Sequence, residues 1–262
     1  MPDASTRAVT LGEAATLDLN GFAITGVTSC SGTPTTCTDT GTGAGVLTGR
    51  SAVVRNGIIR KMGSHGIQGD DGTRVHDVLI EQCGAGGIQG GLGSNAWEID
   101  GVRIRTNGGA GISLAFGAGG RGSVIRNSQI FRNGNDGVEG TGLLLTGNHV
   151  MDNAGLGFRL NFVDGISAFG GNALIGNNGG NANPQTSGDI QMGTNVCGND
   201  TTCPRGVRSC PSSLASERVS RFWPPSPRGS APRPPAPSTA CSRSTRPASP
   251  RAASRATPRA FP

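Results

Sequence analysis

A template of three apolar residues recurs six times along the chain, and it restricts the fold more than any other feature. The second residue always follows the first by five positions, and the third follows the second by eight. The first members are Val54, Val75, Ile99, Ile125, Leu145 and Phe169; the second are Ile59, Ile80, Ile104, Ile130, Val150 and Leu174; the third are Ile67, Ile88, Ile112, Val138, Phe158 and the less apolar Ala182. A fixed core with variable spacers is typical of stacked coils, one supersecondary unit per repeat.

The segments between the template residues predict short strands and exclude helices. Successive repeats begin only 20 to 26 residues apart, which is too close for pairs of helices. Gly-containing pairs interrupt every longer stretch, and an internal Gly costs a helix about 1 kcal/mol relative to Ala. Between these breaks lie β-branched and apolar runs such as 78–80 and 143–145. The sequence therefore predicts an all-β fold, a right-handed single-stranded parallel β-helix of about seven coils.

The three template positions are expected to point inward as aliphatic columns. A glycine precedes the third position in five copies: Gly66, Gly87, Gly111, Gly137 and Gly157. We interpret it as supplying a backbone conformation that a Cβ would disfavour. Close packing of the backbone against the preceding coil is the alternative.

A polar register follows the second template position by three residues. It holds Met62, Cys83 and then four asparagines, Asn107, Asn133, Asn153 and Asn177. Asn tolerates the left-handed conformation, and stacked amides can hydrogen-bond one another, so we expect an internal ladder at a tight bend. A row of polar ligands for a substrate or a metal is the competing interpretation.

On these motifs, the segment from Leu17 to Cys203 resembles bacterial parallel β-helix repeat proteins of the pectate-lyase-like superfamily. Residues 17–24 resemble the opening coil of that group, and residues 54–59 and 125–130 resemble its internal coils. The resemblance implies the fold. It does not imply one activity, because the superfamily holds lyases, hydrolases, epimerases and adhesins.

Composition divides the chain near residue 204. Of the 45 Gly, 43 precede this position, whereas 13 of the 16 Pro lie from Pro204 onward. Residues 204–262 carry a charge of +10, and since the whole chain carries +6, residues 1–203 carry −4. We expect a β-helix domain over 1–203 and a disordered Pro/Arg/Ser-rich tail over 204–262. The tail is interpreted as a non-native extension or as an Arg-rich arm for nucleic acid or anionic polymers; nucleic-acid binding by the folded domain is not expected.

The cysteines and the start of the chain indicate the cellular compartment of the protein. Cys30/Cys37 and Cys197/Cys203 form two close pairs in polar loops, with spacings unlike those of zinc knuckles, so we predict two disulfides. Disulfides imply an oxidising compartment, and the protein is expected to be a secreted or cell-surface monomer. No run reaches transmembrane length and no signal segment precedes Leu17, so we expect a cap and a secretory signal to be encoded upstream of Met1. Cys83 is expected to be buried and inert.

The variable spacers between the third position and the next first position leave the same side of every coil. We expect them to build one wall, and functional residues belong on such variable segments. Beside this wall, one side chain per coil directly follows the third position and is expected to point outward: Gln68, Gln89, Ser113, Glu139 and Arg159.

Five ionisable residues are candidate catalytic groups. His65 lies close in sequence to Asp70 and Asp71, and paired carboxylates can divide acid and base work in glycoside hydrolysis or bind Ca²⁺ for a lyase. These fragments resemble the Asp-Asp and Ser-His-Gly elements of polygalacturonases, but their order differs, so no role carries over. The alternative is a turn with an exposed histidine. Glu139 and Arg159 predict a surface ion pair or, alternatively, a catalytic carboxylate with an arginine clamp.

These residues predict an extracellular β-helix protein that binds or processes a polysaccharide or cell-surface glycan. As an enzyme it would be a polysaccharide lyase or a glycoside hydrolase; the alternative is a non-catalytic, adhesin-like surface module. No cofactor is predicted, and Ca²⁺ enters only with a lyase. A phosphate loop, a Gly-x-Ser-x-Gly elbow and a zinc-binding HExxH motif are all missing from the sequence.

Overall fold

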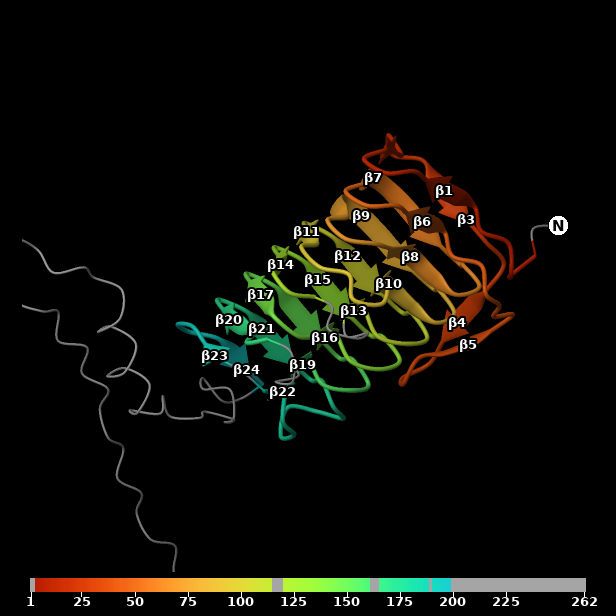
Figure 1. Ribbon diagram of the computed structural model, residues 1–262. Helices are drawn as coiled ribbons and strands as arrows, with labels where there is room; N and C mark the ends of the chain where they lie inside the picture. Colours follow the sequence, from red (N-terminus) through yellow and green to blue (C-terminus); the bar gives the residue numbers. More distant parts are fainter. Residues whose placement is uncertain (1–2, 115–119, 161–164, 189, 199–262) are drawn as a thin grey trace, which may run out of the picture. The chain divides into compact units, whose positions relative to one another are not determined.

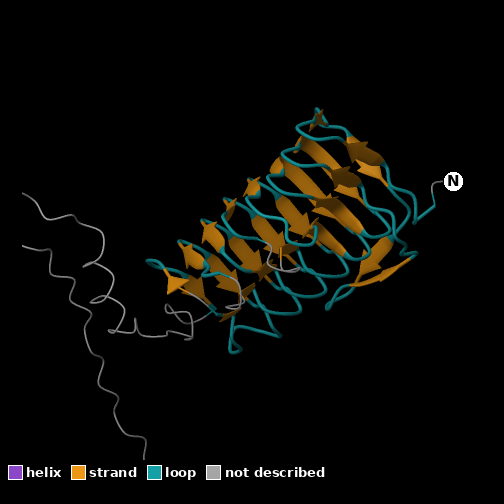
Figure 2. Ribbon diagram, in the orientation of Figure 1, coloured by secondary structure: helices purple, strands orange, loops and turns teal. Residues whose placement is uncertain are grey.

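The computed structural model describes residues 3–114, 120–160, 165–188 and 190–198. All of them belong to the first of two compact units, Met1–Pro211. The proposed tail and the predicted domain boundary lie outside the described residues. Within the described residues, Figure 2 shows only strands and loops, which confirms the prediction of an all-β fold.

Two parallel sheets wrap around a single core (Figure 1). Sheet A has eight strands, one from each coil. In spatial order they are β1 (Val9–Leu11), β6 (Val46–Thr48), β8 (His65–Gly69), β10 (Gly86–Gly90), β13 (Ile112–Leu114), β16 (Val138–Gly140), β19 (Phe158–Leu160) and β22 (Thr186–Ser187).

Sheet B has fourteen strands in two rows. The first row holds β2 (Thr16–Asp18), β11 (Glu98–Asp100), β14 (Ser123–Arg126), β17 (Leu143–Thr146), β20 (Ala168–Gly170) and β23 (Ile190–Gln191). The second row holds β3 (Ala23–Thr25), β12 (Arg103–Arg105), β15 (Gln129–Phe131), β18 (His149–Met151), β21 (Ala173–Ile175) and β24 (Val196–Cys197). Two longer strands, β7 (Val53–Arg60) and β9 (Arg74–Glu81), run through both rows. Each coil therefore passes from sheet A through both rows of sheet B and returns to sheet A.

The aliphatic template forms inward-facing columns, as predicted. Ile104 pairs in register with Ile80 and Ile130, and Ile88 pairs with Ile67 and Ile112. All of these side chains are completely buried. Burying one such side chain contributes about 2–3 kcal/mol relative to leaving it exposed, so the columns supply the main stabilisation of the stack.

The sixth copy of the template differs from the prediction at its third position. Thr186, not Ala182, pairs with Phe158 and continues the column. Leu174 precedes Thr186 by twelve positions, against eight in the other copies, so this turn contains four extra residues. A fixed offset cannot detect an insertion inside the template itself.

The glycines before the third position serve packing rather than backbone conformation, which corrects our first interpretation. No positive φ occurs at any of them, Gly66, Gly87, Gly111, Gly137 and Gly157. A Cβ on Gly111 would lie 2.5 Å from Ile130 Cγ2 and 2.6 Å from the Gly137 carbonyl oxygen. Both atoms belong to the following coil, whereas our alternative had named the preceding one.

The four predicted asparagines form a buried ladder of hydrogen bonds. Asn107 Nδ2 donates to Asn133 Oδ1 over 3.0 Å, Asn133 donates to Asn153 over 2.9 Å, and Asn153 donates to Asn177 over 2.9 Å. Each acceptor oxygen also receives the backbone N–H of the asparagine one coil earlier. Gln185 Oε1 accepts from Asn177 and ends the ladder. The ladder thus satisfies buried polar groups that the turn would otherwise leave unpaired.

The left-handed conformation expected at these asparagines falls instead on the residue before each of them. Thr106, Arg132 and Asp152 have φ of 54°, 55° and 52°. The asparagines are therefore required for their amides and not for their backbone.

A second ladder of amides was not predicted from the sequence. Asn148 Nδ2 donates to Asn172 Oδ1, and Asn172 Nδ2 donates to Asn195 Oδ1, each over 3.0 Å. The Ser128 backbone N–H donates to Asn148 Oδ1 at the start of this column. Ser128, Asn148 and Asn172 each follow a first template residue by three positions, which is the same offset that revealed the first ladder.

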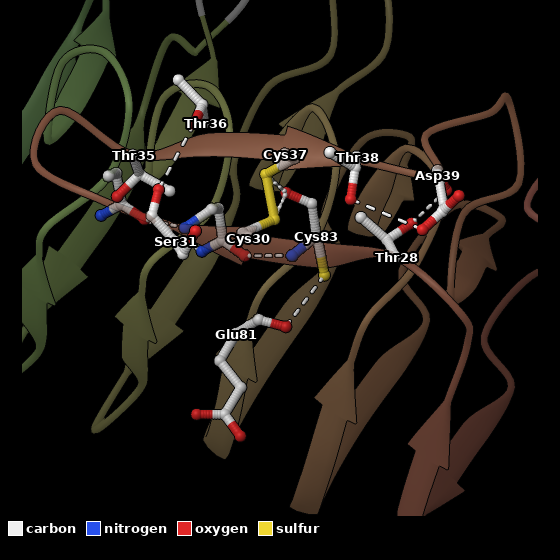
Figure 3. The surroundings of a disulfide bond; sticks show 12 residues. Thr28, Cys30, Ser31, Thr35, Thr36, Cys37, Thr38, Asp39, Glu81 and Cys83 are labelled. Carbon is white, nitrogen blue, oxygen red and sulfur yellow. Dashed lines mark hydrogen bonds between the residues drawn. A yellow bond between two sulfur atoms is a disulfide. The ribbon is translucent and has the colours of Figure 1, made fainter.

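An insertion between β3 and β6 forms an antiparallel hairpin, β4 (Ser29–Ser31) and β5 (Thr36–Thr38). Figure 3 shows the disulfide between Cys30 and Cys37, which confirms that predicted pair. The hairpin lies over the turns that lead from sheet B back to sheet A. Both sulfur atoms are 3.7 Å from the Cys83 carbonyl oxygen, and Thr35 Oγ1 donates to the Arg132 carbonyl oxygen over 2.6 Å. The hairpin therefore contacts several successive coils.

The turn position beneath the hairpin is occupied by glycine. A Cβ on Gly108 would lie 2.9 Å from Cys37 Sγ, and a Cβ on Gly134 would lie 2.7 Å from the Thr35 carbonyl oxygen. One coil further, the equivalent residue is Ala154. For both glycines, the atom nearest to such a Cβ is a carbonyl oxygen of the preceding coil, that of Gly84 for Gly108 and that of Gly108 for Gly134. The close stacking of the coils and the hairpin therefore both crowd these two positions.

Among the described residues, Cys83 is the free cysteine, and it is fully buried. Its thiol points toward the Glu81 carbonyl oxygen, 3.6 Å away, and not toward the disulfide (Figure 3). Burial raises the pKa of the Cys83 thiol to about 12, which keeps it protonated and unreactive. Cys197 is buried in β24, while its predicted partner Cys203 lies outside the described residues.

Candidate functional site

Sheet A presents one side chain per coil directly after the third template position. The strand register pairs Gln68 with Gln89, Gln89 with Ser113, Ser113 with Glu139, and Glu139 with Arg159. Adjacent strands of a sheet lie about 4.8 Å apart, so these side chains repeat at that spacing along the helix axis. We call these five residues the sheet A row.

Ser113 divides the sheet A row into two segments. Only 6% of this residue is exposed, and its hydroxyl has no hydrogen-bond partner among the described residues. On one side of it, Gln68 Nε2 donates to Gln89 Oε1 over 3.4 Å. On the other side, Glu139 and Arg159 remain accessible to solvent. The row therefore offers an amide segment and a charged segment.

Arg159 forms its ion pair with Asp136 and not with Glu139, which corrects the predicted pair. Asp136 is completely buried, whereas the Arg159 side chain is 47% exposed. Asp136 Oδ1 accepts from Arg159 Nη2 over 3.2 Å and from the Leu156 backbone N–H over 2.7 Å. The hydrogen bond that Arg159 donates to Asp136 raises the pKa of the guanidinium group further. Asp136 therefore fixes the guanidinium group at the surface.

Asp136 was not among the candidates predicted from the sequence, so this role was missed. A signal was present, because Asp136 precedes the third template residue of its coil by two positions. His65 has the same offset three coils earlier, and we had singled it out as a candidate.

His65 is the first residue of β8 and is partly buried, so it is not the exposed turn residue of our alternative. Its Nδ1 shares a hydrogen bond of 2.9 Å with Ser64 Oγ. Burial lowers the pKa of His65 to about 4 from its ordinary 6.5, because the surroundings disfavour the charged ring. The imidazole is thus neutral at pH 7.

We expect His65 to make folding stability depend on pH. Because the unfolded chain binds a proton more readily, the free energy of unfolding should fall by about 3 kcal/mol as pH drops from 6.5 to 4. Urea unfolding of the wild type and of His65→Gln at pH 7 and at acid pH measures this. The variant should lose less stability on acidification; equal losses in both proteins would contradict the burial argument.

Asp70 and Asp71 lie in the turn that follows β8. Asp71 Oδ1 accepts the Asn95 backbone N–H over 2.7 Å, and Thr73 Oγ1 donates to the Asp70 carbonyl oxygen over 2.9 Å. Gly72 completes the turn with a φ of 67°. The Asp71 carboxylate therefore links neighbouring coils, while the Asp70 carboxylate is free to face solvent.

The five candidate residues do not meet at one point. His65, Asp70 and Asp71 belong to the coil of Ile67, whereas Glu139 lies three coils further along sheet A. At a spacing of about 4.8 Å per coil, this separation is about 14 Å. General acid–base catalysis requires its groups within hydrogen-bond reach of the same reacting atoms. The described residues therefore present two separate polar groups on one face.

The outer face of sheet B carries ion pairs between neighbouring coils, which the sequence analysis did not predict. Arg126 contacts Glu98 at 2.7 Å and Asp100 at 2.8 Å, and Arg105 contacts Glu81 at 2.7 Å. These side chains are partly exposed, so each pair contributes at most about 1 kcal/mol. An open recess of about 570 Å³ on this face is lined by Thr16, Val53, Arg55, Asn56, Arg74, His76 and Asp77.

The described residues contain no group of three or more His, Cys, Asp or Glu side chains placed to hold a metal ion. In the same part of the chain, no helix is long and apolar enough to cross a membrane.

Comparison with known proteins agrees with the coil geometry. The family described as a right handed beta helix region matches residues 42–197, more than half of the chain. The chain belongs to this family. Its membership confirms the right-handed parallel β-helix that the spacing of the template predicted. No curated protein sequence matches this β-helix protein.

Several solved structures are similar to this β-helix protein in fold. The Azotobacter vinelandii mannuronan C-5 epimerase AlgE6 A-module is 15% identical with a TM-score of 0.43, over 60% of this chain and 56% of that one. The periplasmic alginate epimerase AlgG is 19% identical with a TM-score of 0.41, over 51% and 33%. Pectate lyase Pel9A is 16% identical with a TM-score of 0.40, over 71% and 52%. The chain thus spans between a third and slightly more than half of these proteins, and likeness at this level says nothing about activity.

Proposed function

We propose that the outer face of sheet A binds an extended polysaccharide chain. The observation that carries the proposal is the in-register repetition of polar side chains in the sheet A row, one from each of five successive coils, of which Ser113 is buried. Strands about 4.8 Å apart place successive side chains at nearly the length of one sugar residue in an extended glycan. Amide, carboxylate and guanidinium groups supply the donors and acceptors that sugar hydroxyls require.

We propose binding and not catalysis as the primary role. The separation of about 14 Å between the His65 group and Glu139 supports this choice, because the two groups cannot act together on one bond. Asp71 is already engaged with the Asn95 backbone N–H. A polysaccharide ligand also fits a location outside the cell, and the Cys30–Cys37 disulfide supports an oxidising compartment.

The experiment uses the full chain and a panel of polygalacturonate, alginate and neutral glycans. Binding is measured by isothermal titration calorimetry, and turnover is followed by ultraviolet absorbance of unsaturated products and by reducing ends. At least one glycan should bind without turnover. Gln89→Ala should weaken this binding about fivefold, because it removes a hydrogen-bonding side chain from the sheet A row.

Gln129→Ala is the matched control, since Gln129 is an exposed glutamine on the outer face of sheet B. It should leave the affinity unchanged. Binding that is lost equally in both variants would place the site elsewhere and contradict the proposal. Turnover that disappears in Asp70→Ala would show that the protein is an enzyme.

A further inference from the structure

The outer face of sheet A carries more negative than positive charge among its described residues. Asp136 and Glu139 flank Arg159, and Asp70 lies exposed at the same face. A Cβ on Gly91 would lie 3.1 Å from Asp70 Oδ1, which places this carboxylate beside the next coil of the sheet. The turns at the edge add charges of both signs, from Arg50, Asp71 and Arg121. This face therefore lacks the positive excess that a polyanion requires.

The one guanidinium group of the sheet A row is already neutralised. Arg159 binds Asp136 through both Nε and Nη2, and Asp136 is buried directly behind it. Glu139 occupies the register position beside Arg159, one strand away. A ligand thus meets a fixed donor group next to an acceptor group, with a net negative charge over the three residues. Paired hydroxyl groups satisfy this arrangement, whereas a carboxylate approaching Arg159 would be repelled by Glu139 and Asp136.

The remaining polar groups of the row are uncharged. Gln68 and Gln89 present amides, and the partly buried His65 imidazole is neutral at pH 7. Arginines instead concentrate on the outer face of sheet B, where its strands carry Arg55, Arg60, Arg74, Arg103, Arg105 and Arg126. The acids of the same strands are Asp18, Asp77, Glu81, Glu98 and Asp100. These strands carry six arginines against five acids, and Arg55, Arg105 and Arg126 are already paired with acids. The small positive excess lies on sheet B, so an anionic polymer would be attracted there rather than to the sheet A row.

We infer that the ligand of the sheet A row is an uncharged polysaccharide. The inference rests on the proposed function and selects one class of ligand for that site. An acidic glycan carries a charge on each sugar, and like charges brought together across an interface oppose binding. A neutral glycan contributes only hydroxyl and ring oxygen atoms, which the amides, Glu139 and Arg159 can all match.

The test compares neutral β-1,4-linked gluco-, manno- and xylo-oligosaccharides with oligogalacturonate and oligomannuronate of equal length, using the full chain. A neutral oligosaccharide should bind at least about tenfold more tightly than either acidic one. Its affinity should change less than about twofold between 0.01 M and 1 M ionic strength, because no ion pair with the ligand is screened.

Variants of Glu139 separate the inference from the proposed function. Glu139→Lys should raise the affinity for oligogalacturonate about tenfold at low ionic strength and lower that for the neutral ligand. Glu139→Gln removes only the negative charge, so it should narrow the preference for neutral ligands by less than Glu139→Lys does. If an acidic oligosaccharide binds more tightly than the neutral ones, with an affinity that falls with salt and with Gln89→Ala, the inference is wrong but the proposed binding site is not. If an acidic oligosaccharide binds and Arg74→Ala abolishes this binding, the site lies on sheet B, and both the inference and the proposed function are wrong. Both are also wrong if none of the glycans binds.

Discussion

Replacing Asn153 with alanine is expected to lower the free energy of unfolding by about 4 kcal/mol. The asparagine lies in the middle of the first ladder, and its Oδ1 accepts both the backbone N–H and the side-chain amide of Asn133. The substitution leaves these two buried donors without an acceptor, at about 1–3 kcal/mol each. The melting temperature, followed by circular dichroism, should fall by about 10 °C.

Asn135→Ala is the matched control for this prediction. Asn135 is exposed, lies two positions from Asn133, and its side chain makes no hydrogen bond within the described part of the chain. Its melting temperature should stay within about 2 °C of that of the wild type. If the two variants have the same melting temperature, the ladder does not stabilise the fold as its geometry implies.

Replacing Gly111 with alanine is expected to lower the free energy of unfolding by about 3 kcal/mol. The added Cβ would lie 2.6 Å from the Gly137 carbonyl oxygen and 2.5 Å from Ile130 Cγ2. The carbonyl belongs to the backbone of the next coil, so relief requires the two coils to move apart, and overpacking of this kind costs about 1–3 kcal/mol or more. Thermal melting and urea unfolding both measure the loss.

Gly12→Ala controls for the general effect of adding a methyl group. Nothing lies within 4 Å of a Cβ at Gly12, and its φ is not positive. This variant should be as stable as the wild type or slightly more so, because alanine reduces the freedom of the unfolded chain. A Gly111→Ala protein as stable as the Gly12→Ala protein would refute the packing explanation.

The stacking of the coils could be predicted from the sequence because it depends on periodic apolar positions. The columns around Ile80 and Ile104 repeat at fixed offsets, and any other arrangement would expose them to water. The position of Thr186 was not predicted, because four residues are inserted within that copy of the template. Periodicity thus identifies columns but not the turns that join them.

The candidate site was less accessible to sequence reasoning. The row from Gln68 to Arg159 follows from the alternation of side chains along a strand, and the strands pair these residues as expected, although Ser113 is buried where an outward side chain was predicted. The partner of Arg159 could not be predicted in this way, because Asp136 lies in a turn of the neighbouring coil. Contacts of this kind depend on the path of the turn, which has no repeating signal in the sequence.

The position of the β4–β5 hairpin has a consequence for how the protein is made. Thr35 leaves the ribosome 97 residues before Arg132, the residue whose carbonyl oxygen it binds. At synthesis rates of about 5–20 residues per second, the hairpin waits roughly 5–20 seconds for the surface on which it docks. Once Arg132 has been synthesised, the docked hairpin connects early coils to later ones. This contact can therefore stabilise the β-helix only after about half of the chain has been translated.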